Sequence, residues 1–475
     1  MTRGARIYFA ANLVAQASAL LRYVMLSRLL GPEQLGLAAM LILTSQFFES
    51  VTDTAADRFM VQDAKGDTPV MQKTVQLALF GRGAFLAAAL IVTGVGMGLL
   101  NLNPGLGFSV AALAIVPMIS GLVNLDVYRY QRTGDFRAAS LSQVVAEVSS
   151  LIATGIAAYI TRDHTAIIYG LAVRGIANVL ISWMVAKRRY AWGYSKPEAD
   201  TFRRFALPLF LNGLLLFLGG QGDRLLVGFL GAAELGKYSA IMLLIYYPAN
   251  MIQRYMANIH LPQMAAARDD PAAFNQASRI LGGRTLLLAV GMMGGFTLVG
   301  PIAAPLLFGH QYAQRAEIFA LLAALEGARF LRLWPVTVAL SEGRTTIAMF
   351  DNASRLLALP VAAAAMLITR NLEAILIGFI IGEYLALLTT LALLSRATHV
   401  SLVRESGRLV MLAIFSGLAI AWAYAVPAGN MPVIAGLAVV TILALGQLAR
   451  MERPTITQVL ELARSWLAAR RGAAS

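Results

Sequence analysis

The sequence predicts an all-α integral membrane protein with about fourteen transmembrane helices, forming two six-helix lobes related by a pseudo-twofold axis and followed by two C-terminal helices. Three observations predict this fold class. Hydrophobic residues make up 58% of the 475 residues, charged residues only 13%, and the mean hydropathy is +0.67. Soluble domains carry about twice this share of charge. Long apolar segments recur along the whole chain, and a short motif returns 200 positions after its first occurrence.

The apolar segments define the expected helices one by one. A spanning helix needs about 20 mostly apolar residues to cross about 30 Å of hydrocarbon. Fourteen segments meet this condition: residues 7–28, 35–57, 75–100, 106–128, 139–160, 164–186, 205–230, 239–263, 285–308, 317–340, 345–369, 372–395, 409–426 and 433–449. The first segment is too long for a signal-peptide core and contains Arg22, so we interpret it as a retained helix.

The basic residues predict the orientation in the membrane. Most of the 39 Lys and Arg residues lie in the N-terminal segment and in alternate connections, whereas connections such as 101–105 and 161–163 carry few. This positive-inside bias predicts a multi-pass protein of the cell inner (cytoplasmic) membrane with both termini in the cytoplasm. The formal net charge of +14 therefore follows from topology, and no nucleic-acid partner is expected.

A repeated corner predicts the two lobes. "RLLGPEQLGLAAM" (28–40) is echoed by "GFLGAAELGKYSA" (228–240), and "RTGDFRAAS" (132–140) resembles "SEGRTTIAM" (341–349). Corresponding helices separated by an even number of spans have the same orientation, which is a parallel repeat. We expect Gly and Pro to form the corners and the Leu residues to anchor them at the outer membrane interface.

The repeat and the connections together predict the domain organisation. The longest connection, 187–204, is rich in basic residues and divides the halves. The expected domains are an N-terminal lobe (1–186), a cytoplasmic basic linker (187–204), a C-terminal lobe (205–395), two additional transmembrane helices (396–449) and a cytoplasmic amphipathic tail (450–475). The tail has the pattern of a helix that lies on an anionic membrane surface.

The composition argues against an enzyme, a metal site and a cofactor. The chain has no cysteine, its four histidines are scattered without ligand spacing, and no large extramembrane segment carries paired carboxylates. The stretch 231–238, "GAAELGKY", nearly matches a phosphate-binding loop, but Tyr238 replaces the Ser or Thr that holds magnesium, and the stretch follows a membrane helix and not a strand.

Charged residues inside the apolar segments are the candidate functional groups. Each costs about 2.5 to 3.5 kcal/mol at a helix centre, so these residues are expected to face a bundle interior or water. They are Arg22, Arg28, Arg58, Arg82, Arg174, Arg224, Arg254, Arg329, Arg332 and Arg355, with Glu49, Asp53, Asp57, Asp126, Glu147, Asp223, Glu326, Asp351 and Glu383. Every basic one is Arg, which suits bidentate contacts with phosphate or carboxylate.

The repeat selects six of these residues. Arg22 lies within two positions of the equivalents of Asp223 and Arg224, which predicts that two guanidiniums converge on one anion. Glu49, Asp53 and Asp57 recur every four residues, which predicts one helical face. Asp53 is one position from the equivalent of Arg254, which predicts an inner gate. The predicted substrate-binding residues are Arg22, Arg224 and Arg254, and the predicted gating or ion-coupling residues are Glu49, Asp53 and Asp223.

Structural roles are the alternative for several charges. Arg28, Asp57 and Arg58 have positions suited to snorkelling to the interfaces. Two pairs within one helix are expected from their spacing, Glu326 with Arg329 and Asp351 with Arg355.

The N-terminal stretch "LLRYVMLSRLLGPEQLGLAAMLILTSQFFESVTDTAADR" (20–58) resembles lipid-linked oligosaccharide flippases and polysaccharide exporters. These belong to the multidrug/oligosaccharidyl-lipid/polysaccharide exporter superfamily, together with multidrug antiporters and lipid II flippases. The resemblance implies a V-shaped pair of lobes whose first, second, seventh and eighth spans line a central cavity.

The same resemblance implies the substrate and the partners. A polyprenyl-diphosphate-linked glycan would be moved to the outer leaflet by alternating access, for a surface polysaccharide such as O-antigen or exopolysaccharide. Membrane lipids and polysaccharide assembly proteins would be further partners, and spans thirteen and fourteen would offer a groove for the lipid tail. A multidrug cation antiporter of the same fold is the main alternative. A membrane-embedded glycan polymerase is another, but it would need a large outer loop, and the sequence has none.

Overall fold

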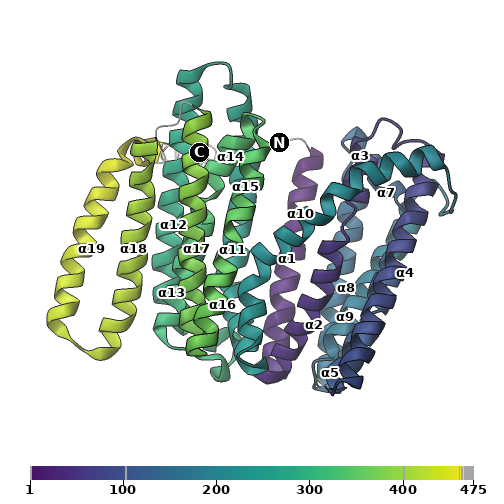
Figure 1. The fold of residues 1–475 in the computed structure, drawn as a ribbon, viewed down its shortest axis with the longest axis horizontal. Helices are drawn as coiled ribbons and strands as arrows, with labels where there is room; N and C mark the ends of the chain where they lie inside the picture. Colours follow the sequence, from purple (N-terminus) through teal and green to yellow (C-terminus); the bar gives the residue numbers. More distant parts are fainter. Residues whose placement is uncertain (1–2, 102–103, 399–401, 459, 462–463, 465–475) are drawn as a thin grey trace, which may run out of the picture. The chain divides into compact units, whose positions relative to one another are not determined.

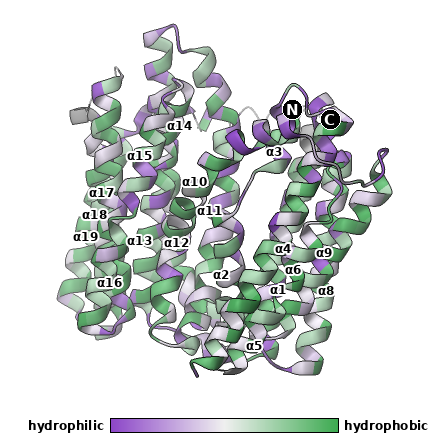
Figure 2. Ribbon diagram, turned by 45° about the vertical axis from the view of Figure 1, so that its right-hand side comes forward, coloured by the Kyte–Doolittle hydropathy of each residue, from purple (hydrophilic) through white to green (hydrophobic). Residues whose placement is uncertain are grey.

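The computed structural model describes residues 3–101, 104–398, 402–458, 460–461 and 464. This part of the chain is helical with short turns and contains no strand, so the predicted all-α fold class is confirmed. Eleven helices within it are long and apolar enough to cross a membrane, by length and composition (Figure 1). The long helices are hydrophobic along most of their length (Figure 2).

Contacts divide the chain into two compact units, and each is described by itself. Unit 1 comprises residues 1–240 and 307–312, and unit 2 comprises residues 241–306 and 313–475. The elements that begin in unit 1 are α1 (Arg3–Leu29), α2 (Pro32–Val51), α3 (Ala56–Gln62), α4 (Pro69–Leu99), α5 (Pro104–Ala112), α6 (Ile115–Ser120), α7 (Asp126–Arg129), η1 (Tyr130–Thr133), α8 (Arg137–Thr161), α9 (Ala166–Val185), α10 (Lys196–Gly228), α11 (Ala232–Ala266) and η2 (His310–Tyr312).

The two copies of the repeated corner pack against each other in unit 1. A Cβ atom on Gly36 would overlap the backbone carbonyl of Ala232, and a Cβ atom on Gly236 would overlap the carbonyl of Pro32. Each corner therefore presents a glycine to the first turn of the helix that follows the other corner. This reciprocal contact gives the repeat of the motif a physical reason, because only a residue without a side chain allows backbones to approach this closely.

The turns of the two corners differ in conformation. Gly31 has a φ of −69°, which any residue adopts, whereas Gly231 has a φ of 129°, which favours glycine. The location of the leucines at the outer membrane interface stays a prediction. Leu30, Leu35 and Leu235 are buried within the protein, because the packed corners enclose them.

Several predicted spans are interrupted. The helix expected over 35–57 ends at Val51, residues 53–55 are not helical, and α3 begins at Ala56. The span expected over 106–128 is divided into α5, α6 and α7. The span 317–340 divides at Arg332, and the span 345–369 divides at residues 356–357. The segments 106–128, 239–263 and 317–340 are the predicted spans that do not appear among the eleven apolar helices.

Unit 2 is built around α13 (Ala316–Leu331), which is buried along nearly its whole length. The elements of unit 2 are most of α11, then α12 (Pro271–Phe308), α13, α14 (Leu333–Ser341), α15 (Thr345–Arg355), α16 (Ala358–Thr369), α17 (Leu372–Ala397), α18 (Leu402–Ala428) and α19 (Met431–Met451). α13 packs against α17 and α18, and α18 packs against α19. Phe330 and Trp334 are fully buried in its core.

A buried ion pair joins the two C-terminal helices, α18 and α19, within unit 2. The Arg408 Nε donates to Glu452 Oε1 at 2.8 Å, and the guanidinium lies over the Trp334 ring at 5.1 Å from its centroid. Of the predicted amphipathic tail, residues 453–458 are helical, while 459, 462–463 and 465–475 lie outside the described residues.

His164 joins three segments of unit 1 in the connection between α8 and α9. The Gln34 side-chain oxygen lies 2.9 Å from its Nδ1 and accepts from its backbone N–H at 3.1 Å, while its Nε2 lies 2.9 Å from Ser109 Oγ. Burial lowers the pKa of His164, and the smaller effect of Asp163 does not offset this. The neutral imidazole is therefore favoured in the folded protein.

We expect unit 1 to lose stability on acidification through the pKa of the unfolded histidine, about 6.5. A base whose pKa is lowered on folding binds fewer protons in the folded protein than in the unfolded protein. The contribution of His164 to the stability of the folded state is therefore complete above the pKa of the unfolded histidine and is lost as the pH falls through it. Thermal unfolding in detergent at pH 7.5 and 5.5 measures the effect, and His164→Gln should reduce the difference. An unchanged difference in this variant would assign the pH dependence to other groups.

Candidate functional site

Arg22 is buried in unit 1 and is bound to α8. Its Nη2 lies 2.9 Å from Glu147 Oε2, and its Nη1 donates to Ser150 Oγ. The other oxygen of Glu147 accepts from the Nε of Arg174, on α9, at 2.8 Å. One carboxylate thus bridges two guanidiniums from different helices, and the charge of Arg22 is compensated inside the protein.

Arg224, the repeat-related residue on α10, has a different environment. It is 8% exposed, its Nη1 donates to Gln221 Oε1 at 3.0 Å, and its buried Nε has no hydrogen-bond partner. No acidic residue pairs with it in the described part of the chain. The convergence of the Arg22 and Arg224 guanidiniums on one anion stays a prediction.

Asp223, next to Arg224, is fully buried. Its Oδ2 accepts a hydrogen bond from the Tyr238 hydroxyl at 2.6 Å. Tyr238 comes from the second copy of the repeated corner and is itself 1% exposed. Tyr238, which replaces the Ser or Thr of the phosphate-binding loop pattern, therefore has a buried carboxylate as its partner.

Glu49 and Asp53 lie at the end of α2 and just beyond it, and both are exposed. The prediction that Glu49, Asp53 and Asp57 line one helical face is wrong, because the helix ends at Val51. The Asp53 carboxylate instead accepts from the backbone N–H of Ala55 at 2.9 Å and so stabilises the turn.

Arg82, on α4, donates hydrogen bonds to groups at the C-terminal end of α2. Its Nη2 donates to the Glu49 carbonyl at 2.8 Å, and its Nε donates to Thr52 Oγ1 at 3.0 Å. A basic side chain is stabilising at the C-terminus of a helix, where backbone carbonyls lack partners. The sequence identified Arg82 as a charge within a span, but it gave no signal of this role.

Arg254 lies on the part of α11 that belongs to unit 2. It is exposed, and its Nε donates to Asn250 Oδ1, one turn earlier, at 2.7 Å. Its predicted partner Asp53 belongs to unit 1. The inner gate between them stays a prediction.

Unit 2 contains a buried network of charges on α13, α15 and α17. Glu383, 2% exposed, accepts from Arg329 at 3.1 Å and from Arg355 at 2.9 Å. Arg329 also lies 2.7 Å from Glu326, which confirms that predicted pair. The network contains three Arg and three acidic residues in all, completed by Arg332 and Asp351.

The predicted pair of Asp351 and Arg355 within α15 is wrong. Asp351 accepts from Arg332 at 2.8 Å and from Thr390 Oγ1 at 2.8 Å, and Arg355 turns to Glu383. Asp351 and Arg355 pair with residues outside α15 because α15 packs closely against α17. Spacing within one helix could not reveal these partners.

Two ion pairs, one in each unit, occupy related places in the repeat with their signs exchanged. The turn glycines Gly134 and Gly343 both have positive φ, 79° and 74°. Arg174 and Glu383 each follow their turn glycine by 40 positions. In unit 1 the acid is on α8 and the Arg on α9, whereas in unit 2 the Arg is on α15 and the acid on α17.

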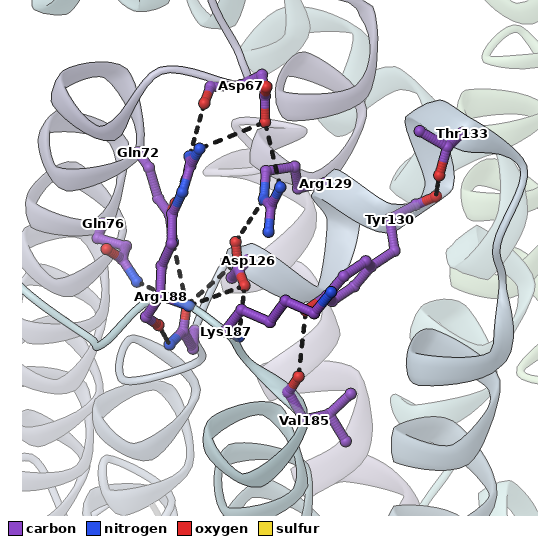
Figure 3. Close-up of polar contacts among 11 residues, drawn as sticks. Asp67, Gln72, Gln76, Asp126, Arg129, Tyr130, Thr133, Val185, Lys187 and Arg188 are labelled. Carbon is purple, nitrogen blue, oxygen red and sulfur yellow. Dashed lines mark hydrogen bonds and ion pairs between the residues drawn. The ribbon is translucent and has the colours of Figure 1, made fainter.

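A second polar cluster lies where α7 meets the predicted linker (Figure 3). Asp126 accepts from Arg129 Nε at 2.7 Å and from the backbone N–H groups of Lys187 and Arg188 at 2.8 and 3.1 Å. Arg129 and Arg188 both approach Asp67, at 3.5 and 3.6 Å. Burial raises the pKa of Asp126, but these hydrogen bonds outweigh it and hold the pKa below its ordinary value.

The same cluster explains the break in the predicted span 106–128. Asn124, 1% exposed, accepts from Gln72 at 3.2 Å and from Gln76 at 3.3 Å, and it donates to the Arg188 carbonyl at 2.9 Å. At the break itself, the Asn124 backbone N–H donates to Ser182 Oγ at 3.0 Å, and the Asp126 backbone N–H donates to Asn124 Oδ1 at 3.0 Å, so these backbone groups have partners outside the helix. The cluster fastens the start of the linker to α4 and is structural.

Comparisons with known proteins agree with this architecture. A family model described as "Polysaccharide biosynthesis protein" matches residues 25–317. No curated protein matches the chain.

Solved structures of transporters share the fold. The inward closed lipid II flippase MurJ has a TM-score of 0.64 at 11% identity, over 93% of this chain and 98% of that chain. An inward-facing multidrug resistance MATE family transporter of the MOP superfamily has a TM-score of 0.61 at 14% identity, over 83% and 95%. A variant of the Vibrio cholerae MATE transporter VcmN has a TM-score of 0.55 at 15% identity, over 82% and 95%. Since the family model covers more than half of the sequence, this multi-pass membrane protein belongs to the polysaccharide biosynthesis protein family.

Proposed function

We propose that the protein is a flippase that moves a polyprenyl-diphosphate-linked oligosaccharide from the inner to the outer leaflet of the cell inner membrane by alternating access. Membership of the polysaccharide biosynthesis family supports a glycan substrate. The fold, which is also that of a lipid II flippase, supports movement of the substrate without chemistry on it. The diphosphate requires a cation at membrane depth, and the glycan requires a polar path.

The observation that carries this proposal is the state of Arg224. A guanidinium that is nine-tenths buried and has no ion pair in the described chain is costly, because burial removes hydration without supplying a counter-charge. Such a group persists where a ligand supplies the missing charge. Its planar donors match the oxygens of a diphosphate.

The two halves of the sequence differ at the position that supplies the partner of Arg22. Arg22 is neutralised by Glu147, on α8. Glu147 lies 13 residues after Gly134. In the second half, the charged residue at the corresponding place is Arg355, which lies 12 residues after Gly343. The second half therefore has no acid at the place in the repeat where the first half has Glu147. We assign headgroup binding to Arg224, whereas Arg22 positions α1 against α8.

The remaining predicted site residues receive supporting roles in this proposal. Asp223 orients the start of the second corner through Tyr238. Glu49, Asp53 and Arg254 are exposed charges near the ends of α2 and within α11, as an inner gate requires.

A multidrug cation antiporter is the alternative, and the buried charges argue against it. Cation transport requires acids that can exchange their counter-ions. The three acids of the buried network in unit 2, Glu326, Asp351 and Glu383, are each bonded to Arg, with shortest distances of 2.7 to 2.9 Å. These guanidiniums do not deprotonate at physiological pH.

Arg224→Gln is expected to reduce flipping by about tenfold or more, because it removes a charge-assisted contact to the headgroup. The measurement is the leaflet distribution of polyprenyl-linked glycans in cells that lack the protein and are complemented with each variant. Inner-leaflet accumulation that wild type relieves and Arg224→Gln does not is the expected result.

Arg204→Gln is the matched control, because Arg204 lies on the same helix, is exposed and has no ion pair in the described chain. It should complement fully. Unchanged glycolipids in the deletion, with raised sensitivity to cationic drugs, would replace the flippase by the antiporter.

A further inference from the structure

Unit 2 contains a second concentration of guanidinium groups, in a pocket of about 460 Å³. The pocket lies where α12 and α15 begin and where α17 ends. Arg268, Arg344 and Arg396 line it, each from a different one of these segments. None of the three belongs to the buried network or to the predicted substrate-binding residues.

The positive charge of this pocket is only partly compensated. Arg344 Nε lies 2.7 Å from Glu342, which also lines the pocket. Arg268 approaches Asp269 at 3.9 Å, but Asp269 is fully exposed and the pair is weak. Arg396 has no ion pair in the described part of the chain. The lining of the pocket therefore contains three guanidiniums and one carboxylate.

The rest of the lining also suits an anion. Asn275 adds an amide, and Phe274, 5% exposed, belongs to the buried core of unit 2. Arg344 is the N-cap residue of α15, and no side chain caps that helix. The positive end of its helix dipole thus lies beside the arginines.

We propose that this pocket binds a phosphate or diphosphate group on the face that the distribution of basic residues assigns to the cytoplasm. The bound anion bridges the three segments and relieves the repulsion among their guanidiniums. A soluble phosphorylated compound and an anionic lipid headgroup share this chemistry. The site goes beyond the proposed transport function and does not depend on it.

Pyrophosphate is the first probe, titrated onto the full-length protein in phosphatidylcholine nanodiscs. We expect Arg396→Gln to weaken its binding about tenfold, because one charge-assisted contact is lost. Glu342→Gln should strengthen binding, because it releases Arg344 from its carboxylate. Arg450→Gln, which removes an exposed Arg of α19 outside the pocket, should leave the affinity unchanged.

Nanodiscs with phosphatidic acid test the lipid source. Thermal stabilisation by phosphatidic acid with no binding of pyrophosphate identifies a lipid headgroup as the ligand. Binding of pyrophosphate identifies a soluble ligand. Either result supports the site if Arg396→Gln weakens the effect. Absence of both effects, or equal weakening by Arg450→Gln and Arg396→Gln, would overturn the proposal. Arg224→Gln should retain pyrophosphate binding, which separates this site from the flippase.

Discussion

Glu383→Gln is expected to lower the free energy of unfolding by about 3 to 5 kcal/mol, the range for breaking a buried ion pair by removing one partner. Glu383 is 2% exposed and accepts hydrogen bonds from Arg329 and Arg355. Glutamine keeps the shape of the side chain but not its charge. The two guanidiniums then repel each other where water cannot solvate them. Thermal or denaturant unfolding in detergent measures the loss.

Two further variants separate the charge network from general damage to α17. Arg355→Gln added to Glu383→Gln should restore much of the stability, because one charge of each sign is gone and Arg329 keeps Glu326. Glu373→Gln, in the first turn of the same helix, should cost less than about 1 kcal/mol, because its partner Arg315 is 64% exposed. Equal losses in the single and double variants would contradict the network.

Gly36→Ala is expected to destabilise unit 1 by about 3 kcal/mol, at the upper end of the cost of overpacking. The added Cβ would overlap the backbone carbonyl of Ala232, which cannot rotate away as a side chain can. The loss occurs although alanine favours a helix over glycine by about 1 kcal/mol. The amount of folded protein in membranes and its thermal unfolding in detergent report the effect.

Gly31→Ala is the control from the same corner. Gly31 has a φ of −69° and nothing within 4 Å of an added Cβ, so alanine should be tolerated. Gly236→Ala should resemble Gly36→Ala, and the double variant should cost less than the sum, because both substitutions disrupt one contact. Comparable effects of Gly31→Ala and Gly36→Ala would show that the corners do not pack as described.

Periodic and compositional features were predictable from the sequence. Apolar length identified the long helices α1, α4, α8, α9 and α17, because each helix must bury or expose to lipid about 20 consecutive residues. The spacing of Glu326 and Arg329 identified a pair within one helical turn. Such features depend only on residues that are close in the chain.

Breaks within the apolar segments were not predictable in the same way. At the helix end by Val51, Arg82, 31 positions away, binds the Glu49 carbonyl, and at the break before α7, Ser182 accepts from the Asn124 backbone N–H. A buried backbone group that leaves a helix needs another hydrogen-bond partner, and at these breaks segments distant in the sequence supply one. Hydropathy does not record where that partner lies.

The sequence by itself determined the membrane fold class, the repeat and the set of charged residues, because these follow from local composition and from self-similarity. Only the tertiary structure decided which charges are compensated. Arg22 and Arg224 lie within two positions of each other in the repeat, yet Glu147 is bonded to the first, and the second has no acid in the described chain. Ion pairing depends on distances of a few ångströms between helices far apart in sequence, and the packing of the helices sets those distances.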